Sequence, residues 1–539
     1  MERIYYNGKI ITMEAPTGKE ALIGAPEAIL VKDGMINAVG KLSDVKSASG
    51  GNVEMVDLDG KCLMPGFIDA HSHISTNGRI SCCAYLGDCA SYDDIISTLR
   101  SYLAAHPVKE GGALIGYSYD HNFLREGGQP DKRVLDQVSK DIPIFILHVS
   151  MHLGCANSKA LEICGITSST PNPQGGLIGR LPGGNEPSGY LEEAGFHLIQ
   201  EAMLKRAEPD FSEIVTNMQE SYLRNGVTTV QDGATARSDL ETLKEIARMG
   251  KLKLDVISYP IMSSGGEKLL HENSDLCGTY RNRLKIGGYK LILDGSPQGR
   301  SAWMSQPYLG GDPSYCGYPW LSDEDAEHYM TVAVEEGRQI LVHCNGDAAS
   351  EQYLDIYEKV LAKTGSKRDL RPVMIHCQTV RNDQLDRMAK IHMIASIFVG
   401  HVYYWGDVHM RNFGSARGNH ISPVADALKR GITVTFHQDT PVTPPQMLHS
   451  VWCAVNRLSR NGVCIGPDQK VPVYEALKAV TCNAAYQYFE ESSKGTLLPG
   501  KRADLVILDR SPLEVETMDL RHIKVLETIK DGETVFKLN

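Results

Sequence analysis

The chain has 539 residues, 42% hydrophobic and 22% charged, so most of it should fold into one large domain with one or two smaller ones. A net charge of −11 and an isoelectric point near 5.9 argue against nucleic acid or an anionic membrane as a partner. No apolar run approaches the roughly 20 residues of a membrane span, and the first residues lack a secretory core. The 13 cysteines follow no repeating frame, which indicates reduced thiols and a cytoplasmic location.

The two ends of the chain are both rich in short strand-like runs broken by glycine. Asn7-Gly8 and Asp33-Gly34 are hairpin signals, because both pairs tolerate positive φ. Each end alone offers few strands for a stable β domain. We therefore expect one small β-sandwich built from both termini, residues 1–61 and 485–539.

The apolar run from Leu63 to Ile68 is expected to be a buried strand, and it is followed closely by His71 and His73. Residues i and i+2 of a strand point to the same side, so the two imidazoles should lie side by side. Two neutral imidazoles suit a divalent transition metal, zinc being the commonest. A lone His-x-His pair is more often an ordinary hydrogen-bonded pair, so the metal interpretation depends on the rest of the chain.

The segment 76–210 is too long for a loop and contains its own strand-like run at 142–149. We expect an inserted α/β subdomain here, after the first strand of the main domain. His148 and His152 form an i, i+4 pair in this segment. It lacks the Glu of a His-Glu-x-x-His motif, so it is a weak metal candidate.

Further strand-like runs follow, separated by helical patterns such as 324–336, which has acidic residues early and Gly337 as its stop. Together with the first strand they make eight, the number that closes a parallel (β/α)₈ barrel. We predict an α/β fold with a TIM-like barrel formed by residues 62–75 and 211–484. The later runs are 227–231, 254–260, 289–293, 339–342, 373–375, 393–398 and 432–436.

Polar residues occur where three of these later runs end. His343 ends the fifth, His376 ends the sixth, and Asp439 follows the eighth. A single histidine after an apolar run is more often a core or loop residue. Four histidines and one aspartate at strand ends converge on one mouth of a barrel, and histidine with carboxylate is a plausible zinc ligand set.

With these motifs in place, the chain resembles the amidohydrolase superfamily over almost its full length. Within the superfamily it is most similar to the branch that includes N-substituted formamide deformylase (metal-dependent amidohydrolase family 3). The motifs that carry the resemblance are the segment 59–73, Asn157-Ser158-Lys159-Ala160-Leu161, the strand 226–232, the Lys-x-x-x-Asp-Gly-Ser pattern at 290–296, His-x-x-Gly-Asp-x-Ala at 343–349, and the exit at 495–506.

The resemblance implies a metal centre of one or two divalent ions, with Zn²⁺ as the first expectation. It makes His71 and His73 ligands of one ion and His343 and His376 ligands of a second or shared ion. It makes Asp439 both a ligand and the catalytic proton shuttle.

The resemblance also implies that Lys290 is a carboxylated lysine bridging two metals. That role requires a CO₂ adduct, because an ammonium beside a dication would be repelled. Alternatively, Lys290 pairs with Asp294 or with a substrate carboxylate. Glu193 is a rival for the carboxylate position, although we favour an ordinary acid on a helix face. His152 matches a family histidine near the substrate pocket and is expected to bind substrate.

The implied activity is metal-dependent hydrolysis of a C–N bond, an amide or N-formyl/N-acyl linkage, in a small molecule. Alternatives are a deaminase or an ester-type hydrolase in the same site, and a non-catalytic scaffold with the same fold. Phe123, Trp303, Tyr403, Tyr404 and Trp405 are candidates for the apolar walls of the substrate pocket, although aromatic residues are more often core. The substrate and the oligomeric state, a homo-oligomer included, stay open.

Overall fold

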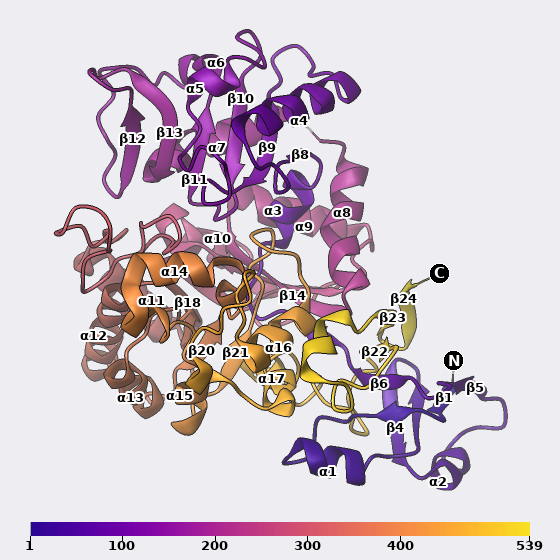
Figure 1. The fold of residues 1–539 in the computed structure, drawn as a ribbon. Helices are drawn as coiled ribbons and strands as arrows, with labels where there is room; N and C mark the ends of the chain where they lie inside the picture. Colours follow the sequence, from indigo (N-terminus) through magenta and orange to yellow (C-terminus); the bar gives the residue numbers. More distant parts are fainter. Residues whose placement is uncertain (1, 208, 539) are drawn as a thin grey trace.

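The computed structural model describes residues 2–207 and 209–538, and the strands in these ranges form five sheets. Figure 1 shows an upper lobe in purple, a central body from magenta to orange, and a lower part where both chain ends lie. Among the described helices, none is long and apolar enough to cross a membrane.

Two sheets contain the terminal strands. One has the order β4-β3-β1-β5 and the other the order β2-β6-β22-β23-β24, so strands from both ends of the chain share a sheet. Apolar side chains such as Ile29, Leu63 and Leu505 are buried together in one cluster. The strands are β1 (Glu2–Tyr6), β2 (Lys9–Ile10), β3 (Ala28–Lys32), β4 (Met35–Gly40), β5 (Glu54–Asp57), β6 (Cys62–Pro65), β22 (Leu505–Leu508), β23 (Val525–Lys530) and β24 (Glu533–Lys537). The domain boundaries stay a prediction, because shared hydrogen bonds do not define where a domain ends.

The two hairpin signals have different outcomes. Asp33-Gly34, with φ of 49° and 78°, joins the antiparallel strands β3 and β4, as predicted. The hairpin prediction for Asn7-Gly8 was wrong. Its flanking strands β1 and β2 belong to different sheets, so these residues form a corner. A Cβ at Gly8 would lie 2.5 Å from the Lys61 carbonyl oxygen, so the corner is too tight for a side chain.

The central body contains two sheets in which every strand pairing is parallel. Their orders are β16-β15-β14-β7 and β17-β18-β19-β20-β21, and a parallel bridge between Ile261 and Lys290 connects them. Strands occur in all eight predicted regions, and a ninth strand, β16, lies just before the fourth region, where none was predicted. They are β7 (Phe67–Ile68), β14 (Val227–Thr235), β15 (Asp255–Pro260), β16 (Leu284–Ile286), β17 (Gly288–Ile292), β18 (Gln339–Cys344), β19 (Val373–His376), β20 (Ile394–Ile397) and β21 (Val434–Phe436).

Helices alternate with these strands, as βα repeats require. The helix predicted at 324–336 is confirmed as α11 (Asp323–Glu336), with Ser322 capping its start and Gly337 at φ 68° ending it. The others in the body are α3 (Ile74–Ile80), α8 (Phe211–Arg224), α9 (Arg237–Arg248), α10 (Gly266–Glu272), α12 (Asp347–Thr364), α13 (Asn382–Lys390), α14 (His401–Gly418), α15 (Val424–Lys429), α16 (Met447–Asn456), α17 (Val473–Lys478) and α18 (Cys482–Gln487).

The apolar run expected to form one strand is divided at Gly66. Its first half is β6, in a terminal sheet, and its second half is β7, in a parallel sheet. Gly66 donates its N–H to the Asp504 carbonyl oxygen, while Phe67 donates to Gly226. A Cβ at Gly66 would lie 2.5 Å from Thr228, so only glycine allows the chain to pass between the two sheets here.

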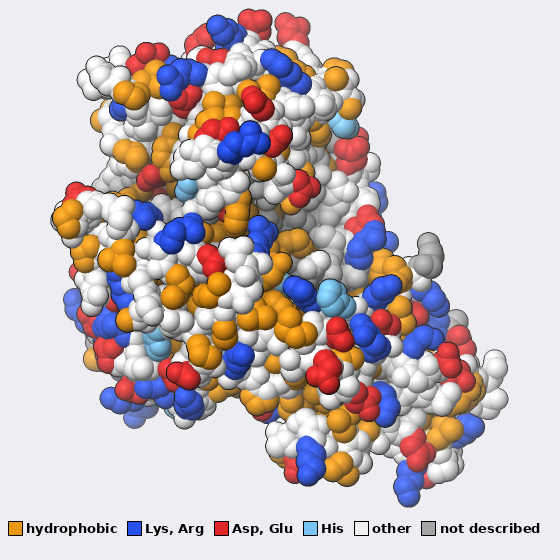
Figure 2. Space-filling model, viewed as in Figure 1, with side chains coloured by type: hydrophobic (Ala, Val, Ile, Leu, Met, Phe, Trp, Pro, Cys, Tyr) orange, Lys and Arg blue, Asp and Glu red, His pale blue; other side chains and the backbone are white. Residues whose placement is uncertain are grey.

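The upper lobe of Figure 1 is built around the six-stranded sheet β12-β13-β11-β10-β9-β8, all from within the predicted insertion. Its strands are β8 (Ala84–Tyr85), β9 (Leu114–Tyr119), β10 (Ile144–His148), β11 (Leu153–Ala156), β12 (Gly176–Arg180) and β13 (Pro187–Glu193), and its helices are α4 (Tyr92–Ala105), α5 (Lys132–Leu135), α6 (Ser158–Ile163) and α7 (Ala194–Ala207). On the face shown in Figure 2, acidic and basic side chains are interspersed over both the lobe and the body.

Candidate metal centre

His71 and His73 meet at Asp439, although not in the way the strand pattern predicted. Strand β7 ends at Ile68, so neither histidine lies on it. The chain is held instead by the His73 N–H, which donates to the Thr440 carbonyl oxygen at 2.9 Å. The Nε2 atoms of both histidines lie 3.2 Å from Asp439 Oδ1. The loop after the strand, rather than strand alternation, brings the imidazoles together.

The other ring nitrogen of each of these histidines is already committed. His71 Nδ1 contacts Gln231 Oε1, and Gln231 uses its Nε2 to donate to Ala70 and Tyr488, which makes its Oε1 the acceptor. His73 Nδ1 donates to the Gly233 carbonyl oxygen at 2.6 Å. Both protons are therefore on Nδ1, and both Nε2 lone pairs face Asp439. Fixing the tautomer in this way is how proteins prepare histidine for a metal.

His376 approaches the same carboxylate from the end of β19, with its Nε2 3.9 Å from Asp439 Oδ2. His376 and Asp439 adopt left-handed backbone conformations, at φ 70° and 55°. Such positions are uncommon outside glycine and gather at functional sites. Behind His376, His437 contacts Nδ1 at 3.3 Å and Ser396 at 3.0 Å, a supporting role that the sequence analysis missed.

His343 lies beside this group. Its ring centroid is 4.5 Å from that of His376, and its Nδ1 contacts Asp294 Oδ1 at 3.2 Å. Asp294 also accepts backbone N–H groups from Asn345, Gly346 and Trp303. Burial raises the pKa of Asp294 to about 7, although those backbone N–H donors oppose the rise. The structure thus brings the ligand atoms of His71, His376 and Asp439 within 4.8 Å of one another. His73 contacts Asp439, and His343 lies beside His376.

Asp439 Oδ1 is buried and accepts no hydrogen bond, although two imidazole nitrogens lie 3.2 Å from it. Burial lowers the pKa of His71 to about 3 and that of His376 well below its ordinary value. Neutral imidazoles facing an unpartnered carboxylate oxygen are a donor set that a divalent cation fits.

Lys290 points to the same centre from β17. Its Nζ lies 3.4 Å from His71 Nε2, and its side chain is buried. Burial lowers its pKa to about 8, although Asp439 opposes the shift. The alternative partner is not supported, since Lys290 forms no ion pair with Asp294 in the described part of the chain and Asp294 is occupied by His343 and backbone donors.

The interpretation of Glu193 as an ordinary helix-face acid was wrong. Glu193 ends strand β13 at φ 46°, is buried, and its Oε2 contacts His152 Nδ1 at 2.7 Å. The chain turns there from strand into α7, which a run of two glutamates does not reveal. The His152 ring lies 5.2 Å from that of His343, so the pair of His152 and Glu193 lies beside the centre.

A second cluster lies in the upper lobe, where Asp120, His121 and His148 place their ligand atoms within 4.8 Å of one another. The Ser150 N–H donates to His148 Nδ1 at 3.1 Å, which puts the proton of the neutral ring on Nε2. That Nε2 lies 3.1 Å from His121 Nδ1, so the two rings form a hydrogen bond. The ring nitrogens that face each other in this cluster are hydrogen-bonded, whereas the Nε2 lone pairs around Asp439 are not. His152 is not part of it.

A parallel α/β fold that gathers histidines, a lysine and an aspartate at its strand ends defines a metal-dependent hydrolase class of protein. The chain belongs to the amidohydrolase family, whose model matches residues 54–536. The resemblance found in the sequence is therefore confirmed. The metal-ligand roles of individual residues stay a prediction.

Known relatives agree with this assignment. The chain is 28% identical to N-substituted formamide deformylase from Arthrobacter pascens, over 94% of each sequence. It is also 28% identical to Protein LONG AFTER FAR-RED 3 from Arabidopsis thaliana, over 98% of this chain and 91% of that one. A solved metal-dependent hydrolase from Pyrococcus horikoshii superimposes with a TM-score of 0.75 at 26% identity, covering 96% of this chain and 99% of that one.

Proposed function

We propose that this protein is a metal-dependent hydrolase that cleaves a C–N bond, an amide or N-formyl/N-acyl linkage, in a small molecule. The observation that carries the proposal is Asp439 Oδ1, which is buried, lacks a hydrogen-bond donor, and faces the Nε2 lone pairs of two imidazoles whose Nδ1 atoms are already hydrogen-bonded. The kinship with N-substituted formamide deformylase supports the choice of bond.

The residues that would hold the cation are His71, His73, His343, His376 and Asp439, with Zn²⁺ as the first candidate. When bound, such a cation lowers the pKa of water and polarises a substrate carbonyl. We further propose that Lys290 completes a two-ion site as a carbamate. The lysine ammonium would first lose one proton, and the neutral amine would then add to CO₂, form an N–C bond and lose a second proton, so that a positive charge is replaced by a negative one.

Asp439 is placed to move a proton. As a carboxylate it can accept a proton from water. Delivery of that proton to the departing nitrogen lets the amine leave as a neutral molecule. His152, whose Nδ1 contacts Glu193 and whose ring lies 5.2 Å from that of His343, would use its Nε2 to bind a substrate oxygen. These roles assign proton transfer to one residue and substrate orientation to another.

We also infer that the two parallel sheets are arcs of one (β/α)₈ barrel. The Ile261–Lys290 bridge joins them on one side, and the hydrogen bond from His73 to Thr440 lies on the other. We further propose that the lobe is an inserted subdomain and that both termini form one β-sandwich. The proposed location is cytoplasmic, and the proposed partner is a small-molecule substrate.

The test is a hydrolysis screen of N-formyl and N-acyl amines, with the metal content of the purified protein measured in parallel. The proposal predicts release of free amine that stops when the metal is chelated and returns when Zn²⁺ is added back. A well-purified chain that binds no stoichiometric metal and hydrolyses nothing would instead be a non-catalytic scaffold. Release of ammonia from an aromatic base, with no amide turnover, would favour a deaminase.

A further inference from the structure

A cavity of about 240 Å³ lies between the upper lobe and the body, directly beside the metal centre. Thr440, the residue after Asp439, lines it, and so does Asn77, whose N–H bonds the His73 carbonyl oxygen at 2.8 Å. The cavity therefore begins one residue from the proposed proton carrier. A substrate whose scissile bond lies at Asp439 would extend into it.

Eight of the 18 residues that line this cavity are aromatic residues or prolines. Tyr85, Tyr117 and Phe123 come from the lobe, while Tyr404 and Trp405 come from α14 in the body. Of the aromatic residues expected to line a pocket, Phe123, Tyr404 and Trp405 do so. Tyr85 is 51% exposed and Phe123 43% exposed, so both side chains lie at the rim of the cavity. Flat apolar walls of this kind favour an aromatic ligand group.

One guanidinium, that of Arg460, stands at the rim of these walls. It stacks over Phe123 at 4.9 Å and over Tyr404 at 5.1 Å. Arg460 is exposed, and in residues 2–207 and 209–538 its side chain forms no ion pair or hydrogen bond. Stacking fixes the plane of a guanidinium and leaves its N–H edge free for a planar anion such as a carboxylate.

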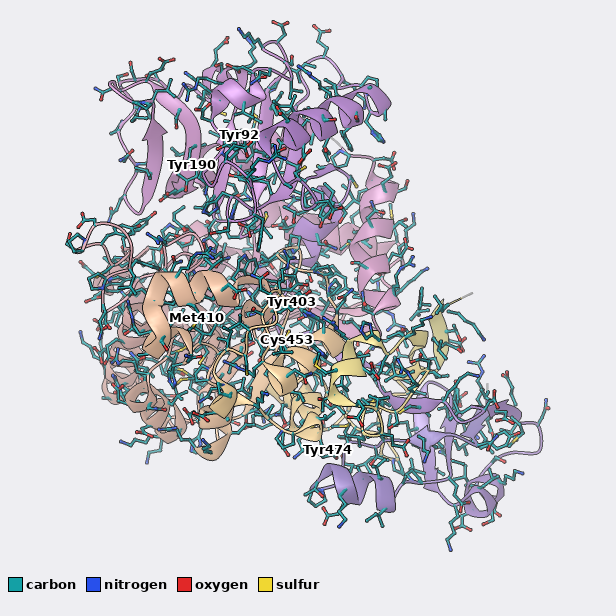
Figure 3. The ribbon with its side chains drawn as sticks, viewed as in Figure 1. Tyr92, Tyr190, Tyr403, Met410, Cys453 and Tyr474 are labelled. Atoms are coloured by element: carbon teal, nitrogen blue, oxygen red, sulfur yellow. The ribbon has the colours of Figure 1, made fainter. Side chains whose placement is uncertain are left out.

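The backbone holds Arg460 in place before any ligand arrives. Its N–H donates to the Tyr403 carbonyl oxygen at 3.0 Å, a residue that Figure 3 marks near the middle of the molecule. The turn that carries it is closed by a hydrogen bond from Ser459 to Val463 at 2.8 Å. The turn is anchored by Arg457, whose buried guanidinium donates to three carbonyl oxygens, those of Ile421, Ser422 and Ile465. Such pre-ordering lowers the entropy lost on binding.

The acid in the cavity wall does not compete for Arg460. Asp120 accepts the Trp405 indole N–H at 2.8 Å and two N–H groups of Asn122 at 2.9 and 3.0 Å. Its oxygens are thus occupied within the wall. Arg460 remains the group at the rim whose donors are free for a ligand.

We propose that this cavity binds the non-reacting part of the substrate, an aromatic group that carries a carboxylate. The ring packs against Tyr404 and Trp405, and the carboxylate pairs with Arg460. This inference rests on the proposed hydrolase function and names its substrate class: N-acylated amines bearing both an aromatic ring and a carboxylate.

The test measures binding to the metal-loaded protein by calorimetry with three probes: 3-phenylpropionate, its neutral analogue 4-phenyl-2-butanone, and propionate. Arg460→Met keeps a flexible side chain of similar length and removes the charge. It should weaken 3-phenylpropionate about 10- to 100-fold, the value of a charged hydrogen bond, and leave 4-phenyl-2-butanone unchanged. Arg521→Met is the matched control, because Arg521 is also exposed and stacked on a ring, Trp452 at 4.7 Å, outside the cavity. It should change neither affinity.

A second variant tests the ring. Tyr404→Leu should weaken 3-phenylpropionate about 2- to 10-fold, the usual value of one aromatic contact, and leave propionate unchanged. Equal binding of 3-phenylpropionate to wild type and Arg460→Met would overturn the proposal, since the carboxylate would then be held at the metal centre. Absence of saturable binding to the wild type would overturn it as well.

The two proposals fail separately. Hydrolysis of neutral N-acyl amines without any dependence of binding on Arg460 would leave the hydrolase standing and remove the carboxylate subsite. Binding that depends on Arg460 without turnover of any N-acyl amine would leave the subsite standing and remove the hydrolase.

Discussion

A buried polar cluster lies at each end of the parallel strands. In one cluster every charge is paired, and in the other a carboxylate oxygen has no donor. At the amino end, three lysines and three carboxylates pair: Lys494 and Lys530 with Asp255 at 2.6 Å each, Lys530 with Asp504 at 2.7 Å, and Lys285 and Lys494 with Glu490. At the carboxyl end, Asp439 faces imidazole lone pairs and keeps one oxygen without a donor.

The amino-end cluster is complete as it stands, because each charge has an opposite neighbour. Its lysines reach across from the C-terminal segment, Lys494 and Lys530, to Asp255 at the start of β15. It therefore fastens the terminal sheet to the body. The carboxyl-end cluster is complementary to a cation that the chain itself does not supply. Burial of charge thus serves cohesion at one end and, in our proposal, the binding of a cation at the other.

The largest effect on metal content and activity should come from removing histidine ligands at the carboxyl end of the strands. His71→Ala combined with His73→Ala removes two ligand nitrogens and should reduce metal content and hydrolysis to background. The fold should persist, because its core lies elsewhere. Metal analysis, an activity assay and far-ultraviolet circular dichroism on one preparation check this. Full metal occupancy in the folded double variant would contradict the ligand assignment.

Replacement of Lys290 tests whether the site at the carboxyl end holds two ions or one. If Lys290 carries the carbamate, Lys290→Ala should lose one of two metals, and added short-chain carboxylic acids should restore part of the activity. Lys290→Arg should fail, since guanidinium cannot take up CO₂ and places a cation beside a cation. Substantial activity and unchanged metal content in Lys290→Arg would leave a single-ion enzyme.

The amino end should respond in the opposite way. Lys530→Met leaves Asp255 and Asp504 with fewer partners in a buried site, and should lower the free energy of unfolding by about 3–5 kcal/mol. Metal affinity of the folded protein should not change. Urea unfolding and a metal titration measure the two quantities. Loss of metal affinity in Lys530→Met would show that the two ends are not independent.

A smaller effect is expected from replacing Gln231, which fixes the tautomer of His71. Gln231→Leu removes the acceptor that fixes the His71 proton on Nδ1, and should weaken metal binding about 10- to 100-fold. The matched control is Gln352→Leu, a buried glutamine whose Nε2 donates to Leu321 and Asp323 away from the site. Equal metal affinity in both variants would sink the tautomer argument.

The smallest effect concerns pH. In the metal-free protein the pKa of His71 is lowered to about 3, so the unfolded chain takes up a proton below pH 6.5 that the folded chain refuses. Stability should therefore fall by about 1.4 kcal/mol per pH unit for each such histidine as pH drops from 6.5 to 5. The pKa values of Asp255 and Glu490 are lowered against burial by their lysine partners, so their contribution persists until pH falls below about 4.

Urea unfolding of metal-free wild type and His71→Gln at pH 7.5, 6 and 5 measures this dependence. The variant should show a shallower slope by about one histidine. Parallel slopes would mean that His71 is not buried as a neutral ring.

Much of the site could be predicted from the sequence, because the ends of apolar strand-like runs can be recognised there. His343, His376 and Asp439 follow apolar runs, and the parallel pairing of these strands brings their ends to one side. Their supports were not visible. Gln231 lies 160 residues from His71, and Asp294 lies 49 from His343, so their pairing depends on how the strands stack.

Local backbone geometry explains the remaining errors. Glu193 was assigned to a helix face, but its left-handed φ ends β13 and turns its side chain to His152. Gly66 divides an apolar run that looks continuous. Of the six strands in the lobe, the sequence indicated one; β8 (Ala84–Tyr85) is too short to leave a periodic pattern.

The most direct test of the central claim is a crystal of the zinc-loaded protein measured at the zinc absorption edge. We expect an anomalous peak within ligand distance of Asp439 and the Nε2 atoms of His71 and His73. We expect none at the hydrogen-bonded cluster of Asp120, His121 and His148. A peak at that cluster with none at Asp439, or no peak at either, would contradict the account.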